Sequence, residues 1–390
     1  MQSIAWSRLG EYLHETQLLG SIQGTLYWDQ NTKMPKGGSS WRGEQLSYLA
    51  GLLHSRQSSS YYESLIKDAK QEYETSLAKG ELSIKLVEDR RINLELLEQD
   101  LNRQKKLDPK LISQLAQAKS KGYQLWQEAK AQNNFKVFSP ALSDLISLRR
   151  EQANQLSEPR SSWETLAQPF EPDITKKRIE ELFSPLRNIL PDLLEEVGSL
   201  NKPLKKQWDL NEGTQEKLCL HLLEQWGRDE NISSISKSPH PFSTTLGPSD
   251  FRITTRIVSG QPLSSFLATA HEWGHSLYEQ GLNFQTHQWF DWPLGQATSM
   301  GVHESQSLFW ENRVARSKAF SERYWRNFEE AGAPLQNADD LWQYMNPLMP
   351  SLNRVEADEL SYGLHILIRT DLEIALLEQG LSVNDLPLEW

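Results

Sequence analysis

The amino-acid sequence predicts an all-α protein, and three observations carry that prediction. The chain has 390 residues, of which 38% are hydrophobic, enough for a large core. Leu recurs at three- and four-residue spacing among Glu, Lys and Gln, as in residues 88–106, which is the pattern of an amphipathic helix. Alternating runs rich in Val, Ile and Thr are nearly absent, and the best of them is residues 251–258. We therefore expect helices interrupted by at most a small β-hairpin.

Interruptions of the helical pattern fall at residues 34–40, 157–162, 228–241 and 346–351, where Gly, Pro, Ser and Asn gather. None of these segments is long or biased enough to be a linker between domains. We therefore expect one compact unit over residues 1–390. Within it, residues 1–230 would form an N-terminal helical layer, and residues 231–390 would carry the chemistry.

Composition and charge exclude several classes of protein. The chain has 41 Lys and Arg against 52 Asp and Glu, a net charge of −11, so a broad basic face for nucleic acid is not expected. No run approaches the ~18 consecutive apolar residues of a membrane span, and the first residues lack the pattern of a signal peptide. We expect a soluble, cytoplasmic protein with no membrane partner. The single cysteine, Cys219, is interpreted as a packed helix residue.

The most specific motif is His-Glu-Trp-Gly-His at residues 271–275, in a segment whose apolar residues keep to one side of a helix. His271 and His275 are four residues apart, so both side chains project from one rim of that helix. Two neutral imidazoles one turn apart can hold one Zn²⁺, and Co²⁺ or Mn²⁺ can take the same ligands. Glu272, about 100° further round the helix, can reach a water on the metal without being a ligand. The motif predicts one water-activating metal ion per chain.

A site of this kind needs a third protein ligand, and residues 299–317 form a second helical segment downstream. Glu304 is the best candidate, because it shares a face of that helix with the other inward residues. His303 could compete, but it points about 100° away, so we expect it behind the ligands or in the pocket. Glu311 lies two turns further along and is either an acceptor behind the ligands or a solvated charge.

Residues 353–380 predict a third helix with a polar stripe at spacings of four, three, four and four. The stripe consists of Asp358, Tyr362, His365, Arg369 and Glu373. Such a stripe is usually a solvated face, but Leu and Ile cover much of the remaining circumference. We therefore expect a buried, hydrogen-bonded stripe near the metal, with Asp358, Tyr362 and His365 supporting the ligands. Arg354, at the start of this helix, is a candidate to grip a substrate carboxylate.

The strand-like segments are residues 240–245 and 250–255, and they lead directly into the helix of the metal motif. An edge strand beside a metal site can pair with an extended peptide. His240, taken alone, is more often a loop histidine than a functional one.

Five ordered motifs resemble those of the M32 metallocarboxypeptidases, the carboxypeptidase Taq family. They are His-Pro-Phe at 240–242, Asp-Phe-Arg-Ile-Thr at 250–254, His-Glu-Trp-Gly-His at 271–275, His-Glu-Ser-Gln-Ser at 303–307 and Arg-Val-Glu-Ala-Asp-Glu at 354–359. Supporting matches at residues 28–38 and 42–46 extend the resemblance over essentially the whole chain. The chain is therefore identified as a member of this family.

The resemblance implies an elongated helical metallopeptidase fold with a central groove, a homodimer, and removal of single residues from the C-termini of peptides. Carried over residue by residue, it assigns the metal ligands to His271, His275 and Glu304, and the general base and acid to Glu272. The substrate-binding residues would be Arg354, facing the terminal carboxylate, and the pocket-shaping residues His240, Asp250 and Arg252.

Members of this family continue beyond the point at which this sequence ends, so we expect a chain truncated at its C-terminus. The absent stretch would be one that helps to line the active site. The resemblance thus leaves two functions open: a metallocarboxypeptidase in which Glu272 activates water, or an impaired remnant that binds metal or peptide without turnover. A metalloendopeptidase is a further alternative.

Overall fold

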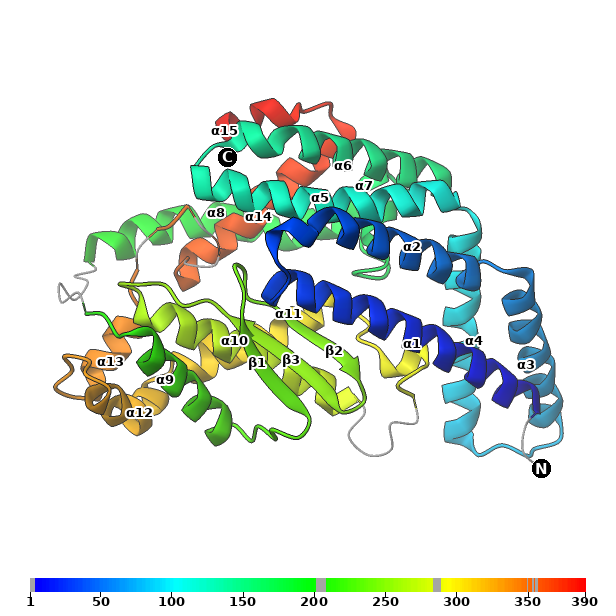
Figure 1. Ribbon diagram of the computed structural model, residues 1–390, viewed down its shortest axis with the longest axis horizontal. Coiled ribbons are helices and arrows are strands. Elements are labelled where there is room, and N and C mark those ends of the chain that lie inside the picture. The colour runs from blue at the N-terminus through cyan, green and yellow to red at the C-terminus, as the bar shows by residue number, and fades with distance from the viewer. Residues whose placement is uncertain (1–3, 201–207, 283–288, 349, 353, 355–356) are drawn as a thin grey trace.

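The computed structural model describes residues 4–200, 208–282, 289–348, 350–352, 354 and 357–390. Helices dominate it (Figure 1), which confirms the all-α prediction. The first part of the chain forms α1 (Ile4–Thr32), α2 (Ser39–Gln57), α3 (Ser60–Ala78), α4 (Ile84–Lys105), α5 (Pro109–Gln132), α6 (Phe135–Leu156), α7 (Ser162–Ala167), α8 (Lys176–Leu200) and α9 (Glu212–Gln225). The predicted breaks at 34–40 and 157–162 separate α1 from α2 and α6 from α7.

After α9 come three strands, β1 (Ser233–Lys237), β2 (Ser243–Gly247) and β3 (Asp250–Thr255). The remaining helices are α10 (Pro262–Leu282), α11 (Met300–Leu308), a π-helix (Phe309–Ala315), α12 (Lys318–Glu330), α13 (Ala338–Met345), α14 (Glu359–Glu378) and α15 (Leu386–Glu389). Short 3-10 turns lie at Lys36–Gly38, Pro293–Gly295 and Val383–Asp385.

Side chains that accept hydrogen bonds from the first free backbone N–H groups fix where many helices begin. Helices α3 to α7 are capped in this way by Ser59, Ser83, Asp108, Asn134 and Ser161. At α7 the contact is reciprocal, because Glu164 also accepts from the backbone N–H of Ser161. The amphipathic pattern thus predicts a helix, and the capping residue sets its first turn.

The sheet is larger than the expected hairpin. Strands β2 and β3 form that hairpin, and β1 adds to the other edge of β3 in parallel, giving the order β1-β3-β2. Residues 228–241 were predicted to be a break, because the strand Ser233–Lys237 within them is polar. Pairing with β3 satisfies its backbone groups, so a strand forms without an apolar alternation. Strand β3 packs against α10 and holds that helix beside the sheet.

Helix α14 begins later than predicted. The predicted helix starts at residue 353, whereas α14 begins at Glu359. Asp358 is its N-cap residue and accepts hydrogen bonds from the backbone N–H groups of Leu360 and Ser361 at 2.9 and 2.8 Å. Arg354 therefore precedes the helix. Residues 353, 355 and 356 of the predicted helix lie outside the described residues.

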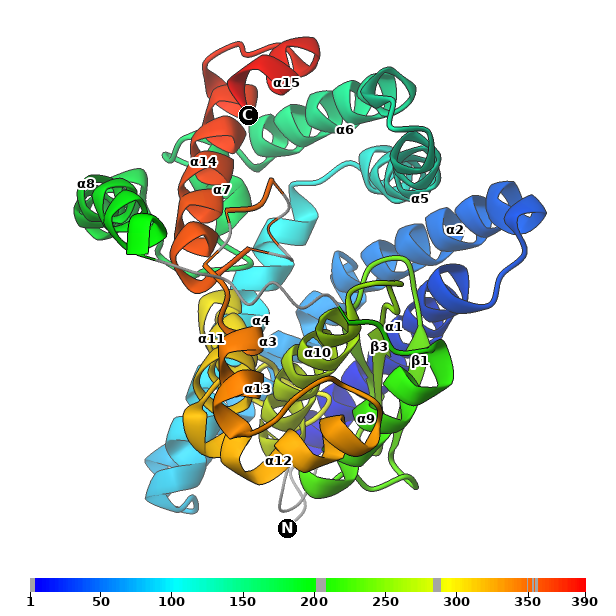
Figure 2. The same cartoon turned by 90° about the vertical axis from the view of Figure 1, so that its left-hand side faces the viewer.

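The helices form two groups with separate cores. Buried side chains of α9, α10, α12 and α13 form one core, including Phe266, Phe328 and Leu341. Buried side chains of α1, α3 and α4 form another, joined by Trp292. Helix α14 packs mainly on α8, α7 and α6, and Figure 2 shows these helices together above α10 to α13. Among the described residues, no helix combines the length and apolar character needed to span a membrane.

Candidate metal centre

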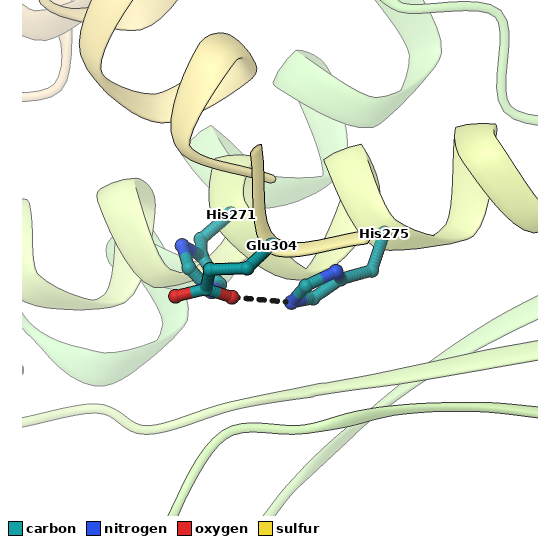
Figure 3. A group of neighbouring side chains, drawn as sticks. All are labelled: His271, His275 and Glu304. Atoms are coloured by element: carbon teal, nitrogen blue, oxygen red, sulfur yellow. Dashed lines mark ion pairs between the residues drawn. The ribbon is translucent and has the colours of Figure 1, made fainter. Parts of the chain in front are cut away.

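His271 and His275 on α10 and Glu304 on α11 converge on one point (Figure 3). Their ligand atoms all lie within 4.8 Å of one another. The carboxylate oxygen Oε2 of Glu304 is 3.6 Å from Nε2 of His271 and 3.3 Å from Nε2 of His275. Two imidazole nitrogens and a carboxylate oxygen at these separations form a donor set that suits a divalent transition metal.

Close packing of α10 against α11 makes this convergence possible. Gly274, between the two histidines, faces α11, and a Cβ atom there would lie 2.8 Å from Cα of Ser307. That distance is well inside van der Waals contact, so only glycine fits without a shift of the helices. The glycine of the motif therefore sets the separation between the histidines and Glu304.

The second nitrogen of each histidine is occupied, which leaves both Nε2 atoms turned toward Glu304. Nδ1 of His271 lies 3.0 Å from Oε2 of Glu311, and Nδ1 of His275 lies 3.2 Å from the backbone carbonyl oxygen of His303. An acceptor on one ring nitrogen fixes the tautomer and the orientation of the ring. The arrangement therefore directs both Nε2 atoms toward one point, where each can bind a cation once its ring is neutral.

Glu304 is held from the opposite side by α14. The Tyr362 hydroxyl donates to its Oε1 atom at 2.8 Å and itself accepts from Nη1 of Arg354 at 2.8 Å. The Ser307 hydroxyl lies 3.1 Å from Oε2. Burial alone would raise the pKa of Glu304, but the hydrogen bond from His275, the charge of His271 and the Tyr362 hydroxyl lower it to about 2. The carboxylate is thus kept ionised and oriented.

Glu272 is almost fully buried, with 7% of its surface exposed, and it lines the same groove as the histidines. Burial raises the pKa of Glu272 to about 7, with the charges of Glu304 and Glu311 adding to the shift and His271 opposing it. For His271, burial acts to lower the pKa, but the hydrogen bond to Glu311 and the surrounding carboxylates raise it to about 9.

His271, His275 and Glu304, the candidate ligands, open into a groove of about 1340 Å³. Its walls include His240 and Phe242 between β1 and β2, Trp208 just before α9, Tyr344 on α13, and Arg354 ahead of α14. The His271, His275 and Glu304 side chains and the Arg354 guanidinium therefore line the same groove.

The remaining site candidates fall into different places. His303 stacks on His275, with ring centroids 4.4 Å apart, and its Nε2 atom lies 2.8 Å from Glu279. His365 lies against the backbone carbonyl of Ser351 at 2.7 Å, where it anchors the segment before α14. Asp358 is occupied in capping α14. His303 therefore lies directly behind the candidate ligand His275, whereas His365 and Asp358 hold the chain that leads to Arg354.

Asp250 and Arg252 pair with each other on β3 through two contacts of 2.7 Å. The Arg252 guanidinium also lies 5.7 Å from the ring of Trp28 on α1. Neither side chain is among the described residues that line the groove. These contacts connect β3 to α1. Asp250 and Arg252 would therefore influence the shape of the pocket only indirectly, through the position of the sheet.

Some contacts of the site had no counterpart in the sequence reasoning. The carbonyl of His303 has no sequence signal, because every residue carries one. Arg316, which pairs with Glu311 at 3.0 Å, lies outside the helical face that was considered. The signal that could have indicated this pair is the position of Arg316, a basic residue five positions after the acidic Glu311.

Comparisons with known proteins agree with this geometry. The sequence model of the family described as carboxypeptidase Taq (M32) metallopeptidase matches residues 8–390. The thermostable carboxypeptidase 1 of Thermus thermophilus is 35% identical, over 99% of this chain and 76% of that protein. The carboxypeptidase 1 of Bacillus subtilis is 33% identical, over 94% of this chain and 72% of that protein.

Solved structures show the same fold. A crystal structure named BsuCP superposes with a TM-score of 0.92 at 30% identity, covering 99% of this chain and 76% of that one. The carboxypeptidase of Pyrococcus furiosus gives a TM-score of 0.85 at 28% identity, covering 100% of this chain and 77% of that one.

A helical fold around two histidines and a glutamate, open to a groove, defines the protein as a metal-dependent peptidase. The chain belongs to the carboxypeptidase Taq (M32) family of metallopeptidases. It is thereby a metal-dependent carboxypeptidase, as the ordered motifs of the sequence predicted.

Proposed function

We propose that the chain removes single residues from the C-termini of peptides, using a divalent cation held by His271, His275 and Glu304. The observation that carries the proposal is that this cluster and the Arg354 guanidinium line one groove. When bound, the cation would polarise the scissile carbonyl group and make a nearby water more acidic. The two imidazoles and one carboxylate favour Zn²⁺, one ion per chain, although Co²⁺ or Mn²⁺ can take the same ligands.

Glu272 is the proposed general base and acid. It follows His271 directly on α10 and borders the same groove, so its carboxylate can reach a water beside the ligands. It takes a proton from the attacking water as the new C–O bond forms at the peptide carbonyl. The same carboxyl group then gives the proton to the leaving nitrogen as the C–N bond breaks. One side chain thus accounts for both proton transfers.

Arg354 is the proposed recognition group for the free C-terminus. A planar guanidinium matches a carboxylate with two parallel N–H donors. Its Nη1 atom lies 3.8 Å from Oε1 of Glu304, so the guanidinium is beside the metal ligands. A terminal carboxylate is about one residue, ~3.8 Å along the chain, from the bond to be cut. The short separation therefore favours removal of one residue at a time, with His240 in the wall of the pocket.

Assembly and location complete the proposal. A homodimer is what the family resemblance implies, and it is supported by large apolar side chains exposed on α1 and α2, namely Leu18, Ile22, Trp41 and Tyr48. A cytoplasmic location is consistent with a single, unpaired cysteine. Sedimentation of the purified chain and fractionation of cells that express it test these two points.

The test of function is release of the C-terminal amino acid from an N-blocked peptide, with added Zn²⁺ and again after chelation. Release that chelation abolishes and Zn²⁺ restores is the expected result. A C-terminally amidated peptide lacks the carboxylate that Arg354 would bind, so internal cleavage of that peptide would indicate an endopeptidase instead. Absence of release from a folded, metal-loaded chain would favour binding of metal or peptide without turnover.

A further inference from the structure

Glu311 lies between a proposed metal ligand and a buried arginine. Its Oε2 atom is 3.0 Å from Nδ1 of His271, and its Oε1 atom is 3.0 Å from Nη2 of Arg316. Both side chains of the ion pair are shielded, with 16% of Glu311 and 15% of Arg316 exposed. Each carboxylate oxygen therefore has its own partner, and the two partners together fix the plane of the carboxylate.

A local change of helix type brings Glu311 to this position. In a regular α-helix, a residue seven positions after Glu304 would lie about 10 Å further along the axis. Here Phe309–Ala315 is a π-helix, whose wider turns are closed by bonds between residues five apart. The backbone N–H of Arg316 donates to the carbonyl of Glu311 at 3.1 Å in this way. Arg316 thus contacts Glu311 through both its backbone and its side chain.

The Arg316 guanidinium reaches α13 through its second terminal nitrogen. Its Nη1 atom donates to the backbone carbonyl of Met345, the last residue of α13. The Asn346 side chain returns the contact, donating to the carbonyl of Arg316 at 3.0 Å. The chain runs from Asn346 through the segment before α14 to Arg354. One guanidinium therefore connects the support of His271 to the start of the segment that carries the proposed carboxylate-binding residue.

We propose that Arg316 is a positioning residue that orients the metal ligand His271 through Glu311 and fixes the end of α13. This inference rests on the proposed role of His271 as a ligand. Without the guanidinium, Glu311 would keep one partner only, and its carboxylate could rotate away from the imidazole. The ring would then lose the contact that directs Nε2 toward Glu304.

The test measures binding of Zn²⁺ to the whole chain by competition with a chromophoric chelator, together with the visible absorption spectrum of the Co²⁺ form. For Arg316→Gln we expect affinity for Zn²⁺ to fall by about 10- to 100-fold, the range typical for removal of groups that hold a metal ligand. Arg316→Lys, which keeps the charge and loses the planar fork, should show a smaller loss. Arg323→Gln, an exposed arginine on α12, is the matched control and should bind Zn²⁺ as the unsubstituted chain does.

A double variant separates positioning from a general loss of structure. If Arg316 acts through Glu311, the pair Glu311→Gln and Arg316→Gln should lose no more affinity than Glu311→Gln alone. Unchanged affinity and an unchanged Co²⁺ spectrum in Arg316→Gln would overturn the proposal. Should that variant not fold, a loss of affinity in Arg316→Lys that adds in full to the loss of Glu311→Gln in the combined variant would do the same. His271→Ala is measured alongside, because undiminished affinity there would overturn the ligand assignment itself.

Discussion

Each of the three proposed metal ligands is held by a group from a different part of the chain. Glu311 of the π-helix contacts His271, the carbonyl of His303 contacts His275, and Tyr362 of α14 contacts Glu304. Supporting groups of this kind commonly contribute tenfold or more to metal affinity. The ligands are therefore oriented by the folded chain before any cation arrives.

Substitution of Glu272 by Gln tests its proposed role in proton transfer. The amide has the shape of the carboxyl group but cannot accept the proton of water, so kcat should fall by about 10²- to 10⁴-fold or more. Affinity for Zn²⁺ should stay within a fewfold of the original, because Glu272 is not among the clustered ligand residues. Peptide hydrolysis and chelator competition measure the two quantities. Turnover at the original rate would exclude Glu272 as the base.

Tyr362→Phe removes the hydroxyl that joins Arg354 to Glu304. Hydrogen bonds to charged groups contribute about 1.5–3 kcal/mol, so the combined loss should appear as a ~10- to 100-fold fall in kcat/KM. Because the hydroxyl contacts both partners, Zn²⁺ affinity and KM for the peptide should weaken together. Tyr61→Phe, at an exposed position on α3, is the control. An effect on KM with no change in metal affinity would show that the contact with Glu304 is unimportant.

The relative positions of candidate site residues were predictable from the sequence where the residues belong to one regular helix. The spacing of His271 and His275 fixes their relation, because both project from consecutive turns. The prediction that Glu304 is the third ligand required only that its helix lie close to the helix of the two histidines. The position of Glu311 was left open, since a regular helix takes it two turns away and the π-helix arises from packing. For Asp250 and Arg252, the family resemblance alone implied a place in the pocket. In the described structure these two side chains pair with each other instead.

At the scale of elements, the contact between α10 and α11 depends on Gly274. Gly274→Ala places a methyl group against the backbone of Ser307 and should destabilise the fold by about 1–3 kcal/mol, despite the better helix propensity of Ala. The helices must separate, so Zn²⁺ affinity should fall as well. Denaturant unfolding and metal titration measure both effects.

Gly281→Ala is a matched control in the same helix. No atom lies within 4 Å of a Cβ placed at Gly281, according to the described surroundings. Ala should therefore leave metal affinity unchanged and stabilise α10 by up to about 1 kcal/mol. Equal behaviour of the two variants would mean that contact with α11 does not constrain the site.

Helices and strands differed in how well the sequence located them. The long amphipathic helices were predictable because their periodicity reflects burial along one face. The start of α14 was wrong by several residues, since a favourable N-cap at Asp358 outweighs apolar spacing upstream. Strand β1 was missed because its stability comes from pairing with β3, a partner about twenty residues away in the sequence.

At the scale of the whole molecule, Cys219 reports on opening of the core that surrounds α9 and α10. It is 1% exposed, and burial raises the pKa of its thiol to about 11 from an ordinary value of 9.0. The raised value means that the native state favours the neutral thiol, and the thiolate forms only as the pH approaches 11. Near pH 8 the reactive fraction should be roughly 100-fold lower than for a free cysteine.

Alkylation of the native chain should therefore be very slow at pH 8 and should accelerate steeply toward pH 11. Because the native pKa is raised, the stability that the neutral thiol contributes is complete below pH 9 and is lost as the pH rises through about 11. Chain unfolded in urea should react at the ordinary rate of a cysteine. Rapid labelling of the native chain at pH 8 would show that this core opens without global unfolding.

The packing of α14 affects where the C-terminus of a substrate would lie relative to the metal site. The helix is fastened to α7 and α8 by Glu378, which accepts from the backbone N–H of Trp163 at 2.8 Å and from Lys176 at 2.6 Å. The metal ligands, in contrast, belong to α10 and α11. A peptide that contacts Arg354 and the cation would therefore contact both the segment before α14 and the helices α10 and α11. If Arg354 binds the terminal carboxylate as proposed, the distance between the start of α14 and the metal site decides that one residue is released, and contacts remote from the reacting bond set this distance.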